Sequence, residues 1–189
     1  MKLEAKVNFD RFEEALQVVD AHTAGEFCRM VIGGFPEPEG NTMIEKKDWM
    51  EKNYDHVRTA LMLEPRGHHD MFGAFLCEPI DKEADLGVIF MDTGGYLNMC
   101  GHCTIGAVTV ALEAGLVECH EGENHVVLDA PAGIIRTTAN VENGKVTGVK
   151  FFGGCPGNHL GIENLVEGMD IDEVIKRLRG LRCGMRESS

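Results

Sequence analysis

The sequence predicts an α+β fold in which the rest of the domain encloses one apolar helix. Short runs rich in Val, Ile and Phe, bounded by Gly and Pro, predict strands. An apolar stripe with helical spacing predicts one amphipathic helix, whereas residues 104–114 are apolar nearly all round, as in a helix without a solvent-facing side. The 189 residues suffice for a domain of ordinary size with its own core.

The first third of the chain is expected to form two strands and a long helix. Residues 16–22 and 27–35 predict short strands joined by the turn Thr-Ala-Gly-Glu, and a Gly/Pro loop follows. Asn41 is the expected cap of a helix over about 43–63, which Pro65 ends. The apolar stripe of this helix comprises Met43, Trp49, Tyr54, Val57 and Leu61.

The middle of the chain is expected to be its most buried part. Residues 71–79 and 84–95 are almost continuously apolar, which predicts strands covered on both faces. The enclosed helix 104–114 follows, with Gly115 as its C-cap. Three antiparallel strands then form a meander, with Asn143 and Gly144 supplying the positive φ of a hairpin turn. Their ranges are 124–133, 134–144 and 145–154.

Charge and cysteine content limit the classes of function. The formal net charge of −13, with no basic cluster, argues against nucleic acid as a partner. No apolar run is long enough to span a membrane, and residues 1–20 lack the apolar core of a signal peptide, so a cytoplasmic protein is expected. The odd count of seven cysteines predicts reduced thiols rather than a disulfide framework.

Residues 100–103, Cys-Gly-His-Cys, have three interpretations. The run matches the redox centre of thioredoxin-like disulfide isomerases, but Met99 precedes it where those proteins have an aromatic residue. A structural zinc site needs a second closely spaced ligand pair, which neither Cys155 nor Cys183 provides. Burial of both thiols as small hydrophobes explains Cys103 well, but it does not explain the glycine and histidine beside them.

The position of Cys100 at the start of a helix favours a reactive thiol. Unpaired backbone N–H groups and the positive end of the helix dipole stabilise both a thiolate and a bound carboxylate. A thiolate there can remove a proton from the carbon next to a carboxylate held by the same N–H groups. Those donors also stabilise the negative charge that develops. The residues therefore indicate Cys100 as an acid/base.

Several motifs of this chain occur together in one known family. In order and at compatible spacing, about residues 18–150 contain VDAHTAGE, IGGFP, LEPRGHHDMFGA, GVIFMDTGGYLNMCGH, TIGAVTVALEAGLV and LDAPAGIIR. This part resembles the N-terminal half of the proline racemase and hydroxyproline epimerase family. The resemblance implies a diaminopimelate-epimerase-like lobe, in which a curved sheet wraps around a central helix. The substrate of such proteins lies between two lobes.

The same resemblance implies a reaction and its residues. The reaction is racemisation or epimerisation of proline or hydroxyproline, the expected small-molecule partner, without metal, pyridoxal or nicotinamide cofactor. Cys100 corresponds to the first catalytic cysteine. Gly101 and His102 correspond to positions that hold the carboxylate, and Phe72 to an aromatic wall of the ring pocket. A homodimer is a further candidate assembly.

The sequence also departs from the family. Cys103 and His69 stand where Gly or Asn is more usual, and the family's second catalytic run, Asp-Arg-Ser-Pro-Cys-Gly-Thr-Gly, does not occur in the 189 residues. The lobe is therefore expected to be an incomplete enzyme. Two alternatives are a non-catalytic or vestigial amino-acid-binding lobe, and a thiol oxidoreductase that uses Cys100 and Cys103.

The chain is expected to divide into a lobe, 1–150, and a partial module, 151–189. The tail resembles a shortened TSCPD domain, because Cys155 and Cys183 match two of that domain's four cysteines while its Thr-Ser-Cys-Pro-Asp run does not occur. Residues 162–184 predict two short amphipathic helical pieces, which would make this appendage helical.

Other polar residues near these motifs are expected to have structural roles. His22 and His68 are expected to form local hydrogen bonds, and Asp92 and Asp129 to cap turns at strand ends. Arg66 can pair with a substrate carboxylate or with a neighbouring acidic residue. Three further cysteines are expected to be unreactive: Cys28, Cys77 and Cys119.

Overall fold

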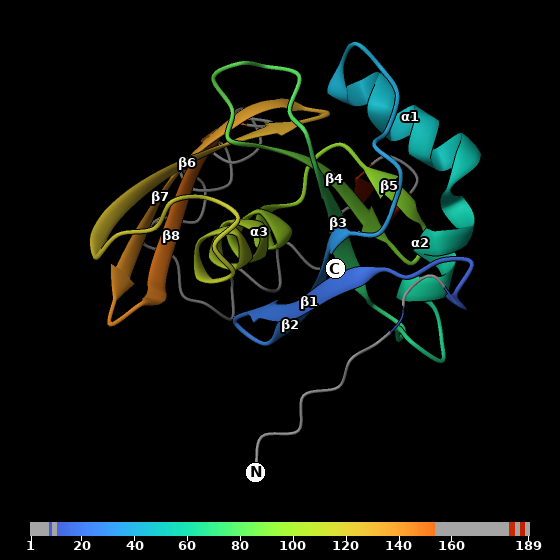
Figure 1. Cartoon of the computed structure of the whole chain (residues 1–189), viewed down its shortest axis with the longest axis horizontal. Coiled ribbons are helices and arrows are strands. Elements are labelled where there is room, and N and C mark those ends of the chain that lie inside the picture. Colours follow the sequence, from blue (N-terminus) through green and yellow to red (C-terminus); the bar gives the residue numbers. More distant parts are fainter. Residues whose placement is uncertain (1–7, 9–10, 154–181, 184–185, 188–189) are drawn as a thin grey trace. The chain divides into compact units, whose positions relative to one another are not determined.

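A mixed sheet forms most of the first part of the chain (Figure 1). The structure, a computed structural model, describes residue 8 and residues 11–153, 182–183 and 186–187. The strands of this sheet are β1 (Gln17–Thr23), β2 (Glu26–Gly33), β3 (Phe72–Cys77), β4 (Leu86–Asp92), β5 (Gly95–Leu97), β6 (Gly122–Ala130), β7 (Gly133–Glu142) and β8 (Lys145–Gly153). The helices are α1 (Met43–Asn53), α2 (Asp55–Met62) and α3 (Gly101–Glu113).

The strand order is β1-β2-β3-β4-β6-β7-β8, with β5 paired to β4. β2 with β3 and β4 with β6 are parallel pairs, and the other neighbours are antiparallel. A parallel pair requires a crossover connection. Helices α1 and α2 lie in the first crossover and α3 lies in the second, so the predicted mixture of helices and strands is confirmed.

Helix α3 lies inside the curve of the sheet (Figure 1). It contacts β1 at one edge of the strand order and β8 at the other, as well as β2, β3 and β7. Most of its residues are buried, including Ala107, Val108 and Ala111, which are fully inaccessible. The predicted enclosed helix is confirmed. It begins earlier than expected, at Gly101 rather than Thr104, so its first turn contains Cys103.

The central strands are covered on both faces, as their apolar runs predict. Alternate side chains of β3 and β4 point to opposite faces of a sheet. Ala74 and Phe90 belong to the core around α3, whereas Phe75 and Ile89 belong to the core beneath α1 and α2. Figure 1 shows α3 on one side of these strands and the helix pair on the other.

The long helix predicted over 43–63 is two helices. Tyr54 leaves helical geometry with φ −133° and ψ 14°, and it ends α1 by donating its N–H to the carbonyl of Met50. The helix cap is Thr42 rather than Asn41, because the Thr42 hydroxyl accepts from the N–H of Glu45 at 3.1 Å. The Glu45 carboxylate accepts from the N–H of Asn41, the residue before the cap. In a standard capping box it would accept from the N–H of the cap residue itself.

Two turns decide where strands end. The strand predicted over 84–95 stops at Asp92, whose Oδ1 accepts from the N–H groups of Gly94 and Gly95, both at 2.8 Å. The chain then returns as β5, which the sequence did not indicate. The meander is confirmed, and Asn143 and Gly144 have φ of 53° and 72° in its last hairpin turn.

The chain divides into two compact units, residues 1–154 and 155–189. In the second unit, Arg182–Cys183 (β9) and Arg186–Glu187 (β10) form an antiparallel pair. Residues 182 and 183 are therefore not helical, and the rest of the helical pieces predicted over 162–184 lies outside the described residues. Within the described ranges, no helix is long and apolar enough to cross a membrane.

Candidate active site at the start of α3

Cys100 occupies the N-cap of α3 and is half-buried. Its backbone is extended, with φ −146° and ψ 116°, and its carbonyl accepts the first hydrogen bond of the helix from Thr104 N at 3.0 Å. The Thr104 hydroxyl donates to the same carbonyl at 2.8 Å. The N–H groups of Gly101, His102 and Cys103 precede that bond, so they belong to the turn whose donors have no partner within a helix.

One imidazole contacts both thiols of the Cys-Gly-His-Cys run. The Sγ of Cys100 lies 3.5 Å from Nδ1 of His102, and the Sγ of Cys103 lies 3.5 Å from Nε2 of the same ring. A protonated imidazole can donate through both nitrogens. The ring can therefore form an ion pair with a Cys100 thiolate while it also donates to the Cys103 sulfur.

The surroundings of the two thiols move their pKa values in opposite directions. A hydrogen bond from the Cys103 thiol and the contact with His102 lower the pKa of Cys100 to about 5, although burial opposes the shift. Sharing a proton with Cys100 and Cys28, together with burial, raises the pKa of Cys103 far above its ordinary value. The bond to Cys100 raises the pKa of His102. Cys100 is thus the thiolate and Cys103 the thiol.

A third thiol belongs to this cluster. Cys28 of β2 is fully buried, and a hydrogen bond with Cys103 lowers its pKa. Gly106, one turn beyond Cys103, makes room for it, because a Cβ at position 106 would lie 2.3 Å from the Cys28 sulfur. Cys28 is a core thiol, as expected, and it also hydrogen-bonds to the site thiol Cys103. Cys28 and Met30 point to the same face of β2, the face toward α3. The packing of α3 against β2 brings this face to Cys103.

Two residues from the sheet hold His102 in place. The rings of Phe72 and His102 meet edge to face, with centroids 4.7 Å apart and an interplanar angle of 85°. The Thr23 hydroxyl, at the end of β1, donates to the His102 carbonyl at 2.9 Å. Phe72 starts β3 and pairs with Cys28 in register, so the aromatic ring and the thiol cluster lie beside each other. The structure thus brings together the four site residues indicated by the sequence.

The same side chains supply metal-ligand atoms. The donor atoms of Cys100, His102 and Cys103 all lie within 4.8 Å of one another. Thiolate and imidazole are ligands that zinc prefers, but a closed structural zinc site takes four protein ligands and these residues supply three.

The other polar candidates have structural contacts. His22 makes the expected local hydrogen bond by accepting from the N–H of Gly25 at 3.3 Å. The His68 ring instead meets that of Phe27, far away in the sequence, edge to face. Arg66 donates to the carbonyl of Ala60 at 2.8 Å, and this partner is neither of the expected carboxylates. Two further thiols behave as expected for core and loop positions: burial raises the pKa of Cys77 to about 12, and Cys119 is exposed.

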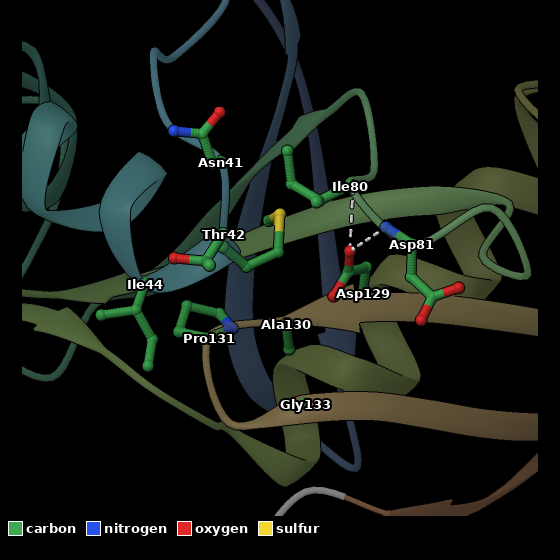
Figure 2. A pocket seen from close by; sticks show the side chains of 10 residues that line it. Asn41, Thr42, Ile44, Ile80, Asp81, Asp129, Ala130, Pro131 and Gly133 are labelled. Atoms are coloured by element: carbon green, nitrogen blue, oxygen red, sulfur yellow. Dashed lines mark hydrogen bonds between the residues drawn. The ribbon is translucent and has the colours of Figure 1, made fainter.

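A pocket of about 410 Å³, whose lining does not include Cys100, lies between the start of α1 and the turn from β6 to β7 (Figure 2). Asp129 is its buried acidic group, and Figure 2 shows its carboxylate beside Ile80 and Asp81. Oδ2 of Asp129 accepts from the backbone N–H groups of those two residues at 2.9 and 2.8 Å. Asp129 therefore caps a turn, as predicted, and its position in this pocket has a structural explanation.

Comparison with known proteins shows the family of the chain. The pattern described as Proline racemase matches residues 18–155. The chain belongs to the proline racemase family. It is 55% identical over 141 residues to the proline racemase of Clostridioides difficile, covering 75% of this chain and 42% of that protein. Proline racemase A of Trypanosoma cruzi is 52% identical over 136 residues, covering 71% and 32%.

The relatives of this chain also include proteins named for other activities. Trans-L-3-hydroxyproline dehydratase of Xenopus tropicalis is 44% identical over 137 residues, covering 72% of this chain and 39% of that protein. A hydroxyproline epimerase of Agrobacterium vitis, solved with bound trans-4-hydroxy-L-proline, has a TM-score of 0.70 and 28% identity, covering 74% and 42%. A probable proline racemase of Agrobacterium radiobacter K84, solved with bound carbonate, has a TM-score of 0.68 and 32% identity, covering 72% and 41%.

These likenesses show that the first unit has the fold type of proline racemase family structures. The chain spans about two-fifths of the length of the bacterial proteins named above. The activity of a full-length proline racemase is therefore a hypothesis for this chain.

Proposed function

We propose that this lobe removes the α-proton of proline or hydroxyproline with the Cys100 thiolate, without a cofactor. The main observation that supports this proposal is the position of the Cys100 sulfur at the N-cap of α3, 3.5 Å from Nδ1 of His102. The relatives of the chain include proline racemases. With a pKa of about 5, Cys100 is deprotonated at neutral pH and is ready to act as a base. The bond that breaks is Cα–H, and the proton moves to Cys100 Sγ.

The start of α3 supplies what the substrate carboxylate needs. The N–H groups of Gly101 and His102 are donors of the first helical turn, and the helix dipole adds partial positive charge. As the α-proton leaves, negative charge spreads from the α-carbon onto the carboxylate, so the same donors stabilise the intermediate more than the substrate. The ring of Phe72 beside His102 offers an apolar surface to the pyrrolidine ring.

Inversion needs a second acid on the opposite face of the α-carbon. Cys103 does not qualify, because it lies in the same helical turn as Cys100, is fully buried and keeps its proton. We propose that the lobe by itself exchanges the α-proton of one enantiomer with retention. A second lobe or a second copy of the chain would have to supply the other acid for racemisation.

The first step is common to several reactions of the family. Loss of the α-proton starts racemisation and epimerisation, and it also starts the elimination of a 3-hydroxyl group, the overall change named for the Xenopus tropicalis dehydratase. The group that faces the substrate opposite Cys100 would then decide the product. Two finer points remain part of the proposal: a diaminopimelate-epimerase-like lobe over 1–150, and a module over 151–189 that resembles a TSCPD domain.

Protection of Cys100 from alkylation tests substrate binding at this thiol. Full-length protein is treated with limiting iodoacetamide in the presence of L-proline, D-proline, pyrrolidine or acetate, and the label is located by peptide mapping. The proposal predicts that one proline enantiomer slows labelling of Cys100, while pyrrolidine, which lacks the carboxylate, does not. Labelling of exposed Cys119 in the same sample is the internal control.

Two outcomes favour the alternatives. Equal labelling of Cys100 in all four solutions would mean that the lobe does not bind proline there. Reduction of insulin disulfides by the protein in the presence of dithiothreitol, lost in Cys103→Ala, would favour the thiol oxidoreductase instead.

A further inference from the structure

The proposed proton transfer does not use the thiol of Cys103. It is fully buried, it contacts the same imidazole as Cys100, and its donor atom lies within 4.8 Å of the Cys100 sulfur. Because Cys100 is half-buried, a small oxidant from solvent reaches Cys100 before Cys103. The pair thus consists of an accessible thiolate with a protected thiol directly behind it.

We propose that Cys103 is the resolving thiol for Cys100, so that oxidation by a peroxide converts the reactive thiol to a reversible intramolecular disulfide. In the first step the Cys100 thiolate attacks hydrogen peroxide, an S–O bond forms, the O–O bond breaks, and hydroxide leaves. In the second step the Cys103 sulfur attacks the sulfenic acid, an S–S bond forms, and the Cys103 proton leaves with the hydroxyl group as water. The peroxide is reduced by two electrons, which come from the two thiols.

The backbone allows this bond. A disulfide needs Cα atoms roughly 4.4 to 6.8 Å apart, and the rise and radius of an α-helix place Cα atoms of residues three apart at roughly 5 Å. Cys103 is fixed within α3, whereas Cys100 is the N-cap, with extended φ and ψ, and the helix holds it through its carbonyl while its side chain is free to change rotamer. A small rotation at Cys100 therefore brings the sulfurs together without opening the helix.

The surroundings favour Cys100 as the attacked partner and Cys103 as the resolver. His102 contacts both sulfurs, so its ring can donate a proton to the departing hydroxyl group. Cys28 lies beyond Cys103 and hydrogen-bonds to it, so the competing bond would join Cys28 and Cys103. Since both of those thiols are fully buried, peroxide meets neither of them first.

The disulfide would remove the Cys100 thiolate and protect it from irreversible oxidation to sulfinic acid. A dithiol reductant restores it by exchange, becoming a cyclic disulfide while both protein thiols are regenerated. The inference rests on the reactivity of Cys100 and does not require isomerase activity, so it stands or falls separately from the proposed function.

The test uses the reduced full chain in EDTA with one equivalent of hydrogen peroxide and with dimedone, which traps sulfenic acid. Intact mass and non-reducing peptide maps are the readouts. In the wild type, the peptide that contains residues 100–103 is expected to lose two hydrogen masses, to carry no dimedone and to recover with dithiothreitol. In Cys103→Ala, dimedone is expected to label Cys100.

Cys119→Ser is the matched control, and it is expected to behave as the wild type. Dimedone labelling of wild-type Cys100 to the extent seen in Cys103→Ala would overturn the proposal. A cross-link between the peptides of Cys28 and Cys103 would also overturn it. The wild-type map decides the matter even where Cys103→Ala fails to fold, because it identifies the bonded pair directly.

Discussion

The Sγ of Cys100 lies 3.5 Å from Nδ1 of His102, and the other nitrogen of that ring lies 3.5 Å from the Sγ of Cys103. The two cysteine side chains that share this imidazole are chemically identical, but their pKa values shift in opposite directions. The imidazole supports a thiolate at the helix N-cap and leaves the buried neighbour protonated. Four of the predictions below follow from this cluster and its packing against the sheet.

Alkylation of Cys100 should be nearly independent of pH around neutrality. The thiolate is the reactive form, and the pKa of Cys100 is about 5. The rate of labelling by iodoacetamide at Cys100 should therefore stay on a plateau down to about pH 6 and fall about tenfold per unit below pH 5. Peptide mapping against pH measures it. A rate that still climbs between pH 7 and 9, or equal labelling of Cys103, would contradict the assignment.

Replacing His102 should move that profile to higher pH. Both His102→Gln and His102→Phe remove the positively charged imidazolium beside the Cys100 sulfur, and His102→Phe also removes the side-chain donor, so the pKa of the Cys100 thiol should rise. His102→Phe keeps an aromatic ring against Phe72 and separates the loss of the donor from the loss of packing. The measurement is the midpoint of the alkylation profile. A midpoint unchanged in both variants would show that the imidazole does not support the thiolate.

Gly106→Ala should destabilise the protein, because the new Cβ would lie 2.3 Å from the Cys28 sulfur. Overpacking of this kind costs about 1–3 kcal/mol. Cys28→Ala removes the sulfur, so the double variant should recover most of the loss that Gly106→Ala causes. Gly148→Ala is the matched control, since nothing lies within 4 Å of a Cβ there. Urea unfolding gives the free energies, and strictly additive effects at positions 28 and 106 would refute the contact.

Arg58→Lys should also lower the free energy of unfolding. Buried Arg58 donates to both carboxylate oxygens of Asp55 and to the carbonyls of Asp92 and Thr93, which ties α2 to the turn after β4. A lysine lacks the planar fork, and the lost bonds should cost about 1–3 kcal/mol. Arg136→Lys, at an exposed ion pair with Glu83, should change stability by less than about 0.5 kcal/mol. Equal losses in both variants would contradict the role of Arg58.

The sequence predicts those parts of the molecule that depend on local patterns. The enclosed helix, the meander and its Asn143-Gly144 turn follow from periodicity and turn chemistry. The break at Tyr54 does not, because both α1 and α2 place their apolar residues against the same core and the stripe continues across it. Periodicity reports which face is buried, but it does not report whether the backbone stays helical.

The same distinction holds for the site. Cys100, Gly101 and His102 are adjacent in sequence, so a helix start is enough to place them together. Cys28 joins them only through the pairing of β2 with β3 and the packing of β2 against Gly106, contacts between segments far apart in the chain. The sequence of one chain predicts neither the strand pairing nor the packing contact. The third thiol of the cluster could therefore be found only from the structure.

The central claim is that the Cys100 thiolate removes the α-proton of proline from one face. The most direct test follows that proton by NMR in deuterium oxide, alongside optical rotation, starting from L-proline and D-proline separately and using the monomeric protein. We predict slow exchange of one enantiomer, with unchanged optical rotation, that is lost in Cys100→Ser. Absence of exchange above the Cys100→Ser background would contradict the claim that the lobe performs this step. Racemisation of both enantiomers would contradict the claim that it holds only one of the two acids.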